Sequence, residues 1–440
     1  MKNYFLIFVI FFLQNCSFDD KSGIWNNNND ISKNKNIFKE FKKLTSIQQS
    51  FNKTIIFNEN ISLDFSNPIQ NFEWKDIYYN ESNNLKNLNY TDLNEIIFKS
   101  KKISKFEINR HILFKDNNLI AGDVKGNITV FSINQNKIIS KFNFYKNKFK
   151  KIEKILNLSV EDSIIYVSDN VGFLYAYDIQ KKNIIWAKNY KIPFSSNLKI
   201  FEEKLIAANQ NNDLYYFNKY NGELLNLIPT EETIFKNEFT NNLSLNGQIL
   251  LYLNTYGTLY ALNNQTMNIL WFLNLNQSVD LNPSNLFNGS KVINDKKVIV
   301  VSSNQFTYVI DILTGSILFK YNFVSAIKPI IYNNFLFLVT KNNLLICVDL
   351  KKGNLVYSYN INKQISDYLK TKEKFVKFKN MMILNNQIFI FLENSYVLKY
   401  NAIGNLKKIE KISPKILSNT LIIDNSLLYL DIKNKLLILN

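Results

Sequence analysis

The sequence predicts an all-β protein, an eight-bladed β-propeller made of four-stranded antiparallel blades. Two observations predict this fold. From about residue 95 onward, short apolar runs with a period of two alternate with turns rich in Asn, Asp, Gly and Lys, which is typical of many short strands. In addition, one strand–turn–strand signature recurs at spacings of roughly 38 to 52 residues, close to the length of one propeller blade.

The recurring signature is a strand of the form Leu-Tyr-Ala-Leu, then Asp or Asn, a short turn and a strand that often carries an aromatic residue. The side chain of the Asp or Asn is expected to accept hydrogen bonds from the amides of the turn. The eight anchor residues, which predict eight blades, are Asn134, Asp178, Asn218, Asn263, Asp311, Asp349, Asn401 and Asn440. Trp186 and Trp271 on the outer strands are expected to pack between blades.

The last copy of the signature has no outer strand of its own, because the sequence stops at Asn440. Residues 95–102 are expected to supply that strand and close the ring, since closure removes the unpaired sheet edges that favour aggregation. Short helices are expected at residues 38–51 and 365–372.

The N-terminus predicts a signal peptide over residues 1–15. Lys2 is followed by the apolar run YFLIFVIFFL, which is too short for a membrane-spanning helix of roughly 20 residues. The sequence Leu-Gln-Asn-Cys that ends at Cys16 resembles a bacterial lipobox, although Asn replaces the usual small residue before the cysteine. This resemblance implies that the Cys16 thiol carries the lipid anchor. The alternative is a secreted protein in which Cys16 has no such role.

The residue after the cysteine is Ser17 and not the Asp that retains bacterial lipoproteins at the inner membrane. The lipobox resemblance therefore implies an anchor in the outer membrane, with the protein facing the periplasm. Residues 16–75 are expected to form a polar tether and an irregular N-terminal segment, and residues 76–440 the propeller.

Composition excludes several classes of function. Lys and Arg number 53 against 36 Asp and Glu, a formal charge of +17, but the basic residues are spread along the chain without a block typical of nucleic-acid binding. One histidine and two cysteines leave little basis for a histidine triad, a zinc site or a disulfide framework. His111 is expected to be a packed or hydrogen-bonded core residue, and Cys347 a buried small apolar one. No catalytic, metal or cofactor site is predicted.

Over about residues 110–440 the repeat resembles the pyrroloquinoline-quinone-type propeller repeat, with the fingerprint Ala-x-Asp-x-x-x-Gly-x-x-x-Trp. Together with the lipobox, the tether and the segment from Asn67 to Trp74, it resembles the family of BamB-like outer membrane protein assembly lipoproteins. This resemblance implies a non-catalytic scaffold of the β-barrel assembly (BAM) complex, which binds the periplasmic domains of a BamA-like insertase beside other subunits. Unfolded outer-membrane proteins are a further partner proposed for that family.

The resemblance also places the contact with the insertase in two loops that follow outer strands. Six residues of these loops are the candidates: Lys191, Ile192, Pro193, Phe194, Lys236 and Glu238. The first loop would contact the insertase through apolar side chains, and the second would contribute charged side chains around that contact. The alternative is that Phe194 and Phe235 fold inward under the ring.

A second class with this repeat is the quinone-dependent dehydrogenase, which uses pyrroloquinoline quinone and calcium. Such enzymes need a calcium-binding set of carboxylate and Asn residues, a catalytic Asp, a tryptophan under the cofactor and commonly two adjacent cysteines. The sequence has no adjacent cysteines, and two of its four tryptophans, Trp25 and Trp74, precede the propeller. This enzyme class and other propeller-type binding lipoproteins remain the alternatives to the scaffold.

Overall fold

The computed structural model describes residues 51–58, 63, 65–145, 149–232, 239–276 and 287–440, together with the two-residue strands β1 (Ser17–Phe18) and β2 (Trp25–Asn26), which pair antiparallel. The chain divides into two units, Met1–Gln49 and Ser50–Asn440, and the second unit carries the fold. In the described parts of the chain, no helix has the length and hydropathy needed to cross a membrane. The predicted signal peptide, Cys16 and residues 38–50 of the predicted N-terminal helix lie outside the described residues.

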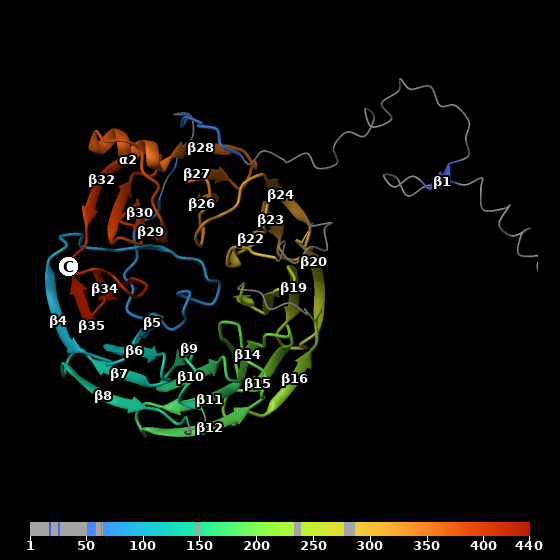
Figure 1. Ribbon diagram of the computed structural model, residues 1–440, viewed down its shortest axis with the longest axis vertical. Coiled ribbons are helices and arrows are strands. Elements are labelled where there is room, and N and C mark those ends of the chain that lie inside the picture. Colours follow the sequence, from blue (N-terminus) through green and yellow to red (C-terminus); the bar gives the residue numbers. More distant parts are fainter. Residues whose placement is uncertain are drawn as a thin grey trace, which may run out of the picture. The chain divides into compact units, whose positions relative to one another are not determined.

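Eight sheets are arranged around a ring in the second unit, as Figure 1 shows, and each has four strands of a blade in antiparallel order. This confirms the predicted eight-bladed propeller. The strands of blades 1 to 4 are β5 (Ile108–Lys115), β6 (Asn118–Asp123), β7 (Ile128–Ser132), β8 (Lys137–Phe142), β9 (Leu156–Glu161), β10 (Ile164–Asp169), β11 (Phe173–Asp178), β12 (Asn183–Asn189), β13 (Lys199–Phe201), β14 (Lys204–Ala208), β15 (Leu214–Asn218), β16 (Leu224–Ile228), β17 (Asn242–Asn246), β18 (Ile249–Leu253), β19 (Thr258–Asn263) and β20 (Ile269–Asn274).

Blades 5 to 8 have the same strand order, and two strands from the N-terminal part of the chain pair with blades 7 and 8. The strands are β21 (Ile293–Asp295), β22 (Val298–Ser302), β23 (Thr307–Asp311), β24 (Ile317–Tyr321), β25 (Ile330–Tyr332), β26 (Phe335–Val339), β27 (Leu344–Asp349), β28 (Leu355–Asn360), β29 (Phe378–Leu384), β30 (Gln387–Leu392), β31 (Tyr396–Tyr400), β32 (Leu406–Lys411), β33 (Leu421–Ile423), β34 (Ser426–Leu430) and β35 (Lys435–Leu439), with β3 (Asn87–Leu88) parallel to β29 and β4 (Ile96–Lys102) antiparallel to β35.

The pairing of β4 with β35 closes the ring as predicted. Leu439 lies opposite Ile96 and Lys435 opposite Lys102, so the early strand serves as the outer strand of the last blade. Backbone hydrogen bonds in both directions between Glu95 and Asn440, of 3.1 and 3.0 Å, fix the end of the pair. In the described structure the last blade is therefore completed by β4, as the other blades are completed by their own outer strands.

The anchor residues act as predicted in most blades. Asp178 Oδ1 accepts the backbone N–H groups of Gln180 and Lys181 at 2.8 and 2.9 Å. The prediction is wrong in the first blade, where β7 ends at Ser132 and this residue occupies the anchor position two residues before Asn134. The hydroxyl of Ser132 accepts the Gln135 amide at 3.4 Å, because Ser forms the same kind of turn more weakly than Asp.

Trp186 and Trp271 pack between blades, as expected. The Trp186 indole N–H donates to the carbonyl of Lys219 in the next blade at 2.9 Å, and its ring lies against Gly222. Trp271 repeats this arrangement with the carbonyl of Ile312 and with Gly315. In these turns the glycine four residues after the anchor therefore leaves room for an aromatic ring of the preceding blade.

The helix α2 (Ile361–Leu369) follows β28 and begins four residues earlier than predicted. Its N-terminus is set by Asn360, whose side chain accepts the backbone N–H of Lys363 at 3.0 Å, a common N-cap interaction. The helix contacts β28 and β32 and so lies on the outer side of blades 6 and 7.

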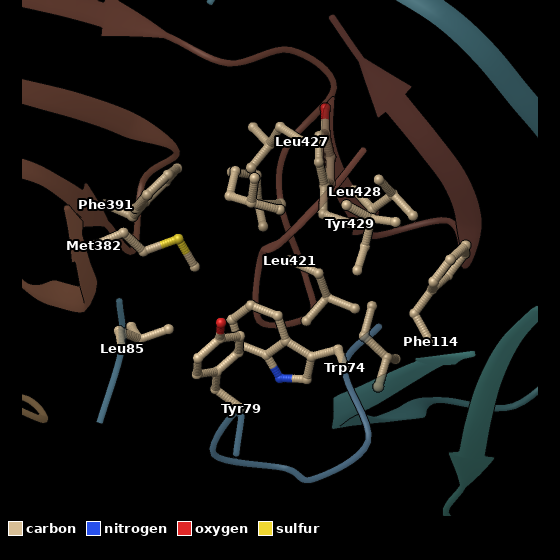
Figure 2. Close-up of a cluster of buried hydrophobic side chains, with 14 of the residues drawn as sticks. Trp74, Tyr79, Leu85, Phe114, Met382, Phe391, Leu421, Leu427, Leu428 and Tyr429 are labelled. Carbon is tan, nitrogen blue, oxygen red and sulfur yellow. The ribbon is translucent and has the colours of Figure 1, made fainter. Parts of the chain in front are cut away.

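An axial segment, which we define as residues 71–90, crosses the middle of the ring (blue in Figure 1). Figure 2 shows its side chain Trp74 near Leu421 of the last blade and Phe114 of the first, with Tyr79 beside Trp74 and Leu85 toward Met382 of blade 7; all belong to one buried apolar cluster. The segment makes hydrogen bonds to all eight blades, to the inner strand of blades 1 to 6 and to the residue directly after it in blades 7 and 8. In blade order the residues are Phe114, Val160, Lys199, Leu245, Asn294, Ile331, Asn385 and Asp424. It therefore fills the axis of the propeller.

Candidate interaction surfaces

The strand order gives the ring two different faces. Because the four strands of a blade alternate in direction, the outer strand of each blade ends on the face where the inner strand of the next begins. We call this the entry face. Residues 191–195 join β12 to β13 and therefore lie on it, as do the last residues of the other outer strands.

The predicted contact loop on the entry face is only partly exposed. Lys191 is exposed, Ile192 and Pro193 are half-buried, and Phe194 is 2 % exposed. The Phe194 ring lies 5.8 Å from that of Tyr190 and 6.0 Å from that of Tyr215, in edge-to-face or tilted contacts within the joint of blades 2 and 3. The inward alternative for Phe194 is therefore the one that the structure shows.

The backbone of this loop is fixed by hydrogen bonds. The Phe194 amide donates to the carbonyl of Asp169 at 2.9 Å, and the carbonyl of Pro193 accepts the Gln210 amide at 2.8 Å. A Cβ at Gly172, which has a φ of +96°, would lie 3.0 Å from backbone atoms of Ile192. The hydrogen-bonded backbone of the loop therefore holds the exposed Lys191 in place on the entry face. Lys236, Glu238 and Phe235 of the second predicted loop lie outside the described residues.

A second surface, which the sequence reasoning missed, lies on the outer edge of blades 3 to 5. Figure 1 shows β16, β20 and β24 in succession along this edge. We define the apolar rim by eight side chains, each more than two-fifths exposed: Leu224, Leu225, Leu227, Ile269, Leu270, Phe272, Ile317 and Leu318. Contiguous exposed apolar side chains are characteristic of interaction sites.

Two of the three outer strands of the apolar rim, β16 and β20, differ from most other outer edges in charge. The outer strands β4, β8, β12, β24 and β32 carry lysine, a residue that discourages the pairing of an edge with another chain. The outer strands β16, β20 and β28 have no charged residue. This difference is present in the sequence, and a search for uncharged outer strands would have found it.

The uncharged edge of β28 is covered by the chain itself. Ile55 pairs with Ser358 of β28 through two backbone hydrogen bonds of 2.9 Å, so residue 55 extends the sheet of blade 6 (blue segment beside β28 in Figure 1). Helix α2 packs on the same strand. The uncharged strands β16 and β20 keep exposed apolar side chains in the described structure.

Buried charges lie along the axis. The ammonium of Lys199, in β13, is 2.7 Å from the carboxylate of Asp76 and donates to the carbonyl of Asn80 at 2.9 Å and to Asn83 Oδ1 at 2.8 Å. Burial is the largest influence on the pKa of Lys199 and lowers it, while the charge of Asp76 opposes that effect. The ion pair joins the axial segment to blade 3.

An axial cavity of about 410 Å³ lies on the entry face, between the axial segment and the inner strands. Its charged lining residues are Arg110, Lys291, Lys328 and Lys379, and its lining contains no Asp or Glu. The ammonium of Lys328 donates to the carbonyls of Tyr78 and Asn83 at 2.9 and 2.7 Å. Burial lowers the pKa of Lys328 to about 7 and that of Lys379 to about 8.

His111 lies in the inner strand of the first blade and lines the same cavity. Its Nδ1 is 2.8 Å from Nδ2 of Asn419, and its ring meets the ring of Tyr78 edge-on at 5.6 Å. Burial, together with the charges of Lys291 and Lys328, lowers the pKa of His111 to about 4, so the imidazole is neutral at pH 7. The expected hydrogen bond of His111 is confirmed, but the residue is half-buried at the cavity wall and is not part of the core. Cys347 is buried in β27, also as expected, and burial raises the pKa of its thiol.

Known structures with the same fold include two classes of natural protein. BamB from Moraxella catarrhalis matches with a TM-score of 0.62 and 12 % identity, over 79 % of this chain and 99 % of that one. A europium-containing methanol dehydrogenase matches with 0.61 and 10 %, over 83 % and 89 %, and the quinohemoprotein alcohol dehydrogenase from Comamonas testosteroni with 0.58 and 11 %, over 81 % and 76 %. At such identities the likeness shows the fold alone.

Sequence comparison separates the two classes. No curated protein matches the chain by sequence. The family model described as "Outer membrane protein assembly factor BamB" matches residues 124–359, which is more than half of the 440 residues. The chain therefore belongs to the BamB family of outer membrane protein assembly factors.

Proposed function

We propose that the protein is a non-catalytic scaffold subunit of the BAM complex, which binds the periplasmic domains of a BamA-like insertase and so aids the insertion of barrel proteins. Membership of the BamB family supports this proposal. The observation that carries it is the apolar rim, where two neighbouring blades expose uncharged outer strands. A surface of this kind favours binding of another protein.

The backbone pairing at the edge of β28 suggests how the apolar rim binds its partner. There an extended segment of the chain already pairs with an uncharged outer strand, through Ile55 and Ser358. Strands β16 and β20 are likewise uncharged outer strands with exposed apolar side chains, and the outer edge of a sheet presents backbone N–H and C=O groups to another chain. An extended strand of an unfolded outer-membrane protein, or of the insertase, would add to them in the same way.

Lys191, Ile192 and Pro193 remain proposed contacts on the entry face, with Phe194 as the buried base of their loop. Lys236 and Glu238 remain proposed contacts of the neighbouring loop. Other BAM subunits are further partners of the proposed complex.

The residues present do not fit the cofactor set of a quinone-dependent dehydrogenase. Among the described residues, no group of three or more His, Cys, Asp and Glu side chains is arranged to hold a metal ion, and calcium requires several oxygen ligands. The axial segment fills the centre of the ring, and the cavity beside it is lined by cations. We therefore propose a binding role and no enzymatic one.

We further propose that Cys16 carries the lipid that anchors the protein at the periplasmic face of the outer membrane. Replacement Cys16→Ser should release the protein from the membrane fraction into the soluble periplasmic fraction. Retention of the Cys16→Ser protein in the outer membrane would contradict the anchor but not the scaffold.

The scaffold is tested by crosslinking in cells, solubilisation of membranes in detergent, capture of the tagged protein and identification of the captured proteins. We expect a BamA-like barrel protein to be recovered with the wild type and to be lost with the double variant Leu225→Lys/Leu270→Lys. The matched control is Ile138→Lys/Ile185→Lys, which adds the same charges to exposed positions of β8 and β12. If no barrel protein is captured, or if both double variants lose it equally, the proposal fails.

A further inference from the structure

We propose that the axial cavity of the entry face binds an acidic segment of a protein, with several carboxylates close together in sequence. This inference is independent of the apolar rim, which lies on the outer edge, and of the identity of the partner that the scaffold holds.

The first argument is the arrangement of charge. Arg110 in β5, Lys291 before β21, Lys328 before β25 and Lys379 in β29 bring four cations from four blades to one cavity without a carboxylate in its lining. A carboxylate near this group, that of Glu393, is 3.9 Å from the guanidinium of Arg110, in a pair that is largely exposed to solvent. Exposed pairs of this kind contribute little energy.

The second argument is that these cations act on one another. Burial is the largest influence on the pKa of Lys379 and lowers it; the charge of Glu393 raises this pKa, and the charge of Arg110 lowers it. For His111, burial again comes first, and the charges of Lys291, Lys328 and Arg110 lower the pKa further. A group of like charges in a partly desolvated cavity destabilises the folded state. A bound anion would remove this repulsion, so the arrangement favours a negatively charged ligand.

The third argument concerns the class of anion. The cavity of about 410 Å³ has room for a few side chains, and its cations are held at separate places on the ring. Lys328 is fixed by the carbonyls of Tyr78 and Asn83, and Lys379 donates to the carbonyl of Leu417 at 2.8 Å. Separated, fixed cations match several linked carboxylates better than one compact ion. The cavity also lies on the entry face, together with the exposed loop of Lys191.

Binding should be coupled to proton uptake. The pKa of Lys328 is lowered to about 7, and carboxylates bound beside it would raise that pKa. The groups that act on Lys328 or face it in the cavity are Arg110 and His111 of β5, Lys291 and Lys379, with Asp76 and Lys199 behind it in the axial segment and β13. His111 is neutral near pH 7 and contributes no charge. The affinity for an acidic segment should therefore decrease as the pH rises from 7 to 9, an expectation that follows from linkage.

The test is calorimetric titration of the full chain with a blocked peptide that contains the sequence Glu-Asp-Glu-Asp, at low salt and about pH 7. The variant Arg110→Gln/Lys291→Gln should weaken binding by about tenfold or more, because it removes two of four charges. The control Lys181→Gln/Lys182→Gln removes two exposed cations from the turn between β11 and β12, on the opposite face, and should leave the affinity unchanged. Titrations in two buffers of different ionisation enthalpy should show proton uptake, which Lys328→Met should reduce to the smaller part that Lys379 contributes.

Three results would overturn the inference. The first is equal binding of the peptide with Gln and Asn in place of Glu and Asp, and the second is an unchanged affinity in the Arg110→Gln/Lys291→Gln variant. The third is binding of inorganic phosphate or citrate as tight as that of the peptide, which would assign the cavity to a small anion. Circular dichroism of each variant separates these outcomes from loss of folding.

Discussion

The axis of the ring has charged side chains in its interior, whereas the outer edge of blades 3 to 5 has apolar side chains on its surface. At the axis, Lys199, Lys328 and Asp76 lie among inner strands, where apolar residues would pack well. On the outer edge of blades 3 to 5, eight large apolar side chains are exposed to solvent. Each arrangement runs against the free energy of burial, which favours apolar groups inside and charged groups outside.

The two regions differ in what compensates for this cost. The axial charges are satisfied within the chain, since Lys199 has three partners and Lys328 two in the axial segment. The apolar rim has no such compensation within the described structure, whereas the uncharged β28 is covered by Ile55. The axis should therefore govern the stability of the ring, and the rim should govern binding.

The largest expected effect is at the axis, in the variant Lys199→Met. It leaves the carboxylate of Asp76 buried without its cation, and breaking a buried pair in this way costs about 3–5 kcal/mol. Urea denaturation should show this decrease in the free energy of unfolding. The double variant Lys199→Met/Asp76→Asn should recover much of the loss, because no unpaired charge remains. A loss below about 1 kcal/mol in the single variant would contradict a structural role of the pair.

The next effect is at the joints between blades, between the axis and the edge. Gly222→Ala should destabilise the protein by about 2–4 kcal/mol, because it adds a side chain at a φ of +71° and a Cβ 2.4 Å from the Trp186 ring. Gly247→Ala is the matched control, since Gly247 also has a positive φ but no atom within 4 Å of the added Cβ. We expect thermal or urea unfolding to show about 1–2 kcal/mol for the control. Equal losses in both variants would mean that the tryptophan packing contributes little.

The repeat made most of the fold predictable. Most blades show their own alternation of apolar residues and their own turn anchor, so these local signals agreed on one architecture, and residues 95–102 were assigned to the closing strand correctly. The error at Asn134 arose because the first blade has Ser132 at the anchor position, and Ser does not distinguish a strand end from other polar positions. The axial segment was not predicted, since it has almost no regular secondary structure, and its contacts are with residues far away in sequence.

The sites were less predictable than the fold. The sequence identified residues 191–195 as an exposed loop but left the side chain of Phe194 undecided, because the direction of a single side chain in a loop depends on its neighbours in the adjacent blade. The cations of the axial cavity are spread between residues 110 and 379, and they come together only through closure of the ring. The uncharged outer strands, in contrast, are a local feature and could have been found in the sequence.

A smaller effect at the axis is a dependence of stability on pH. The pKa of Lys328 is about 7 in the folded protein and near its usual 10.5 when unfolded, so between these values the unfolded state binds more protons. Stability should therefore rise with pH from 7 to about 10, and this residue contributes a slope of at most about 1.4 kcal/mol per pH unit. Lys328→Met should reduce the slope measured by urea denaturation at several pH values. The same slope in the variant and the wild type would show that Lys328 is not the group responsible.

The smallest effect on stability is expected at the apolar rim. Leu225 and Leu270 are exposed on β16 and β20, so Leu225→Lys/Leu270→Lys should change the free energy of unfolding by no more than about 0.5 kcal/mol per substitution. The same variant should reduce self-association at high protein concentration, measured by sedimentation velocity, because lysine on an open edge discourages pairing of strands. The variant Ile138→Lys/Ile185→Lys should leave self-association unchanged, since β8 and β12 already carry lysine. If the rim variant instead unfolds as readily as Lys199→Met, its leucines belong to the core of the blades, and the contrast between axis and edge fails.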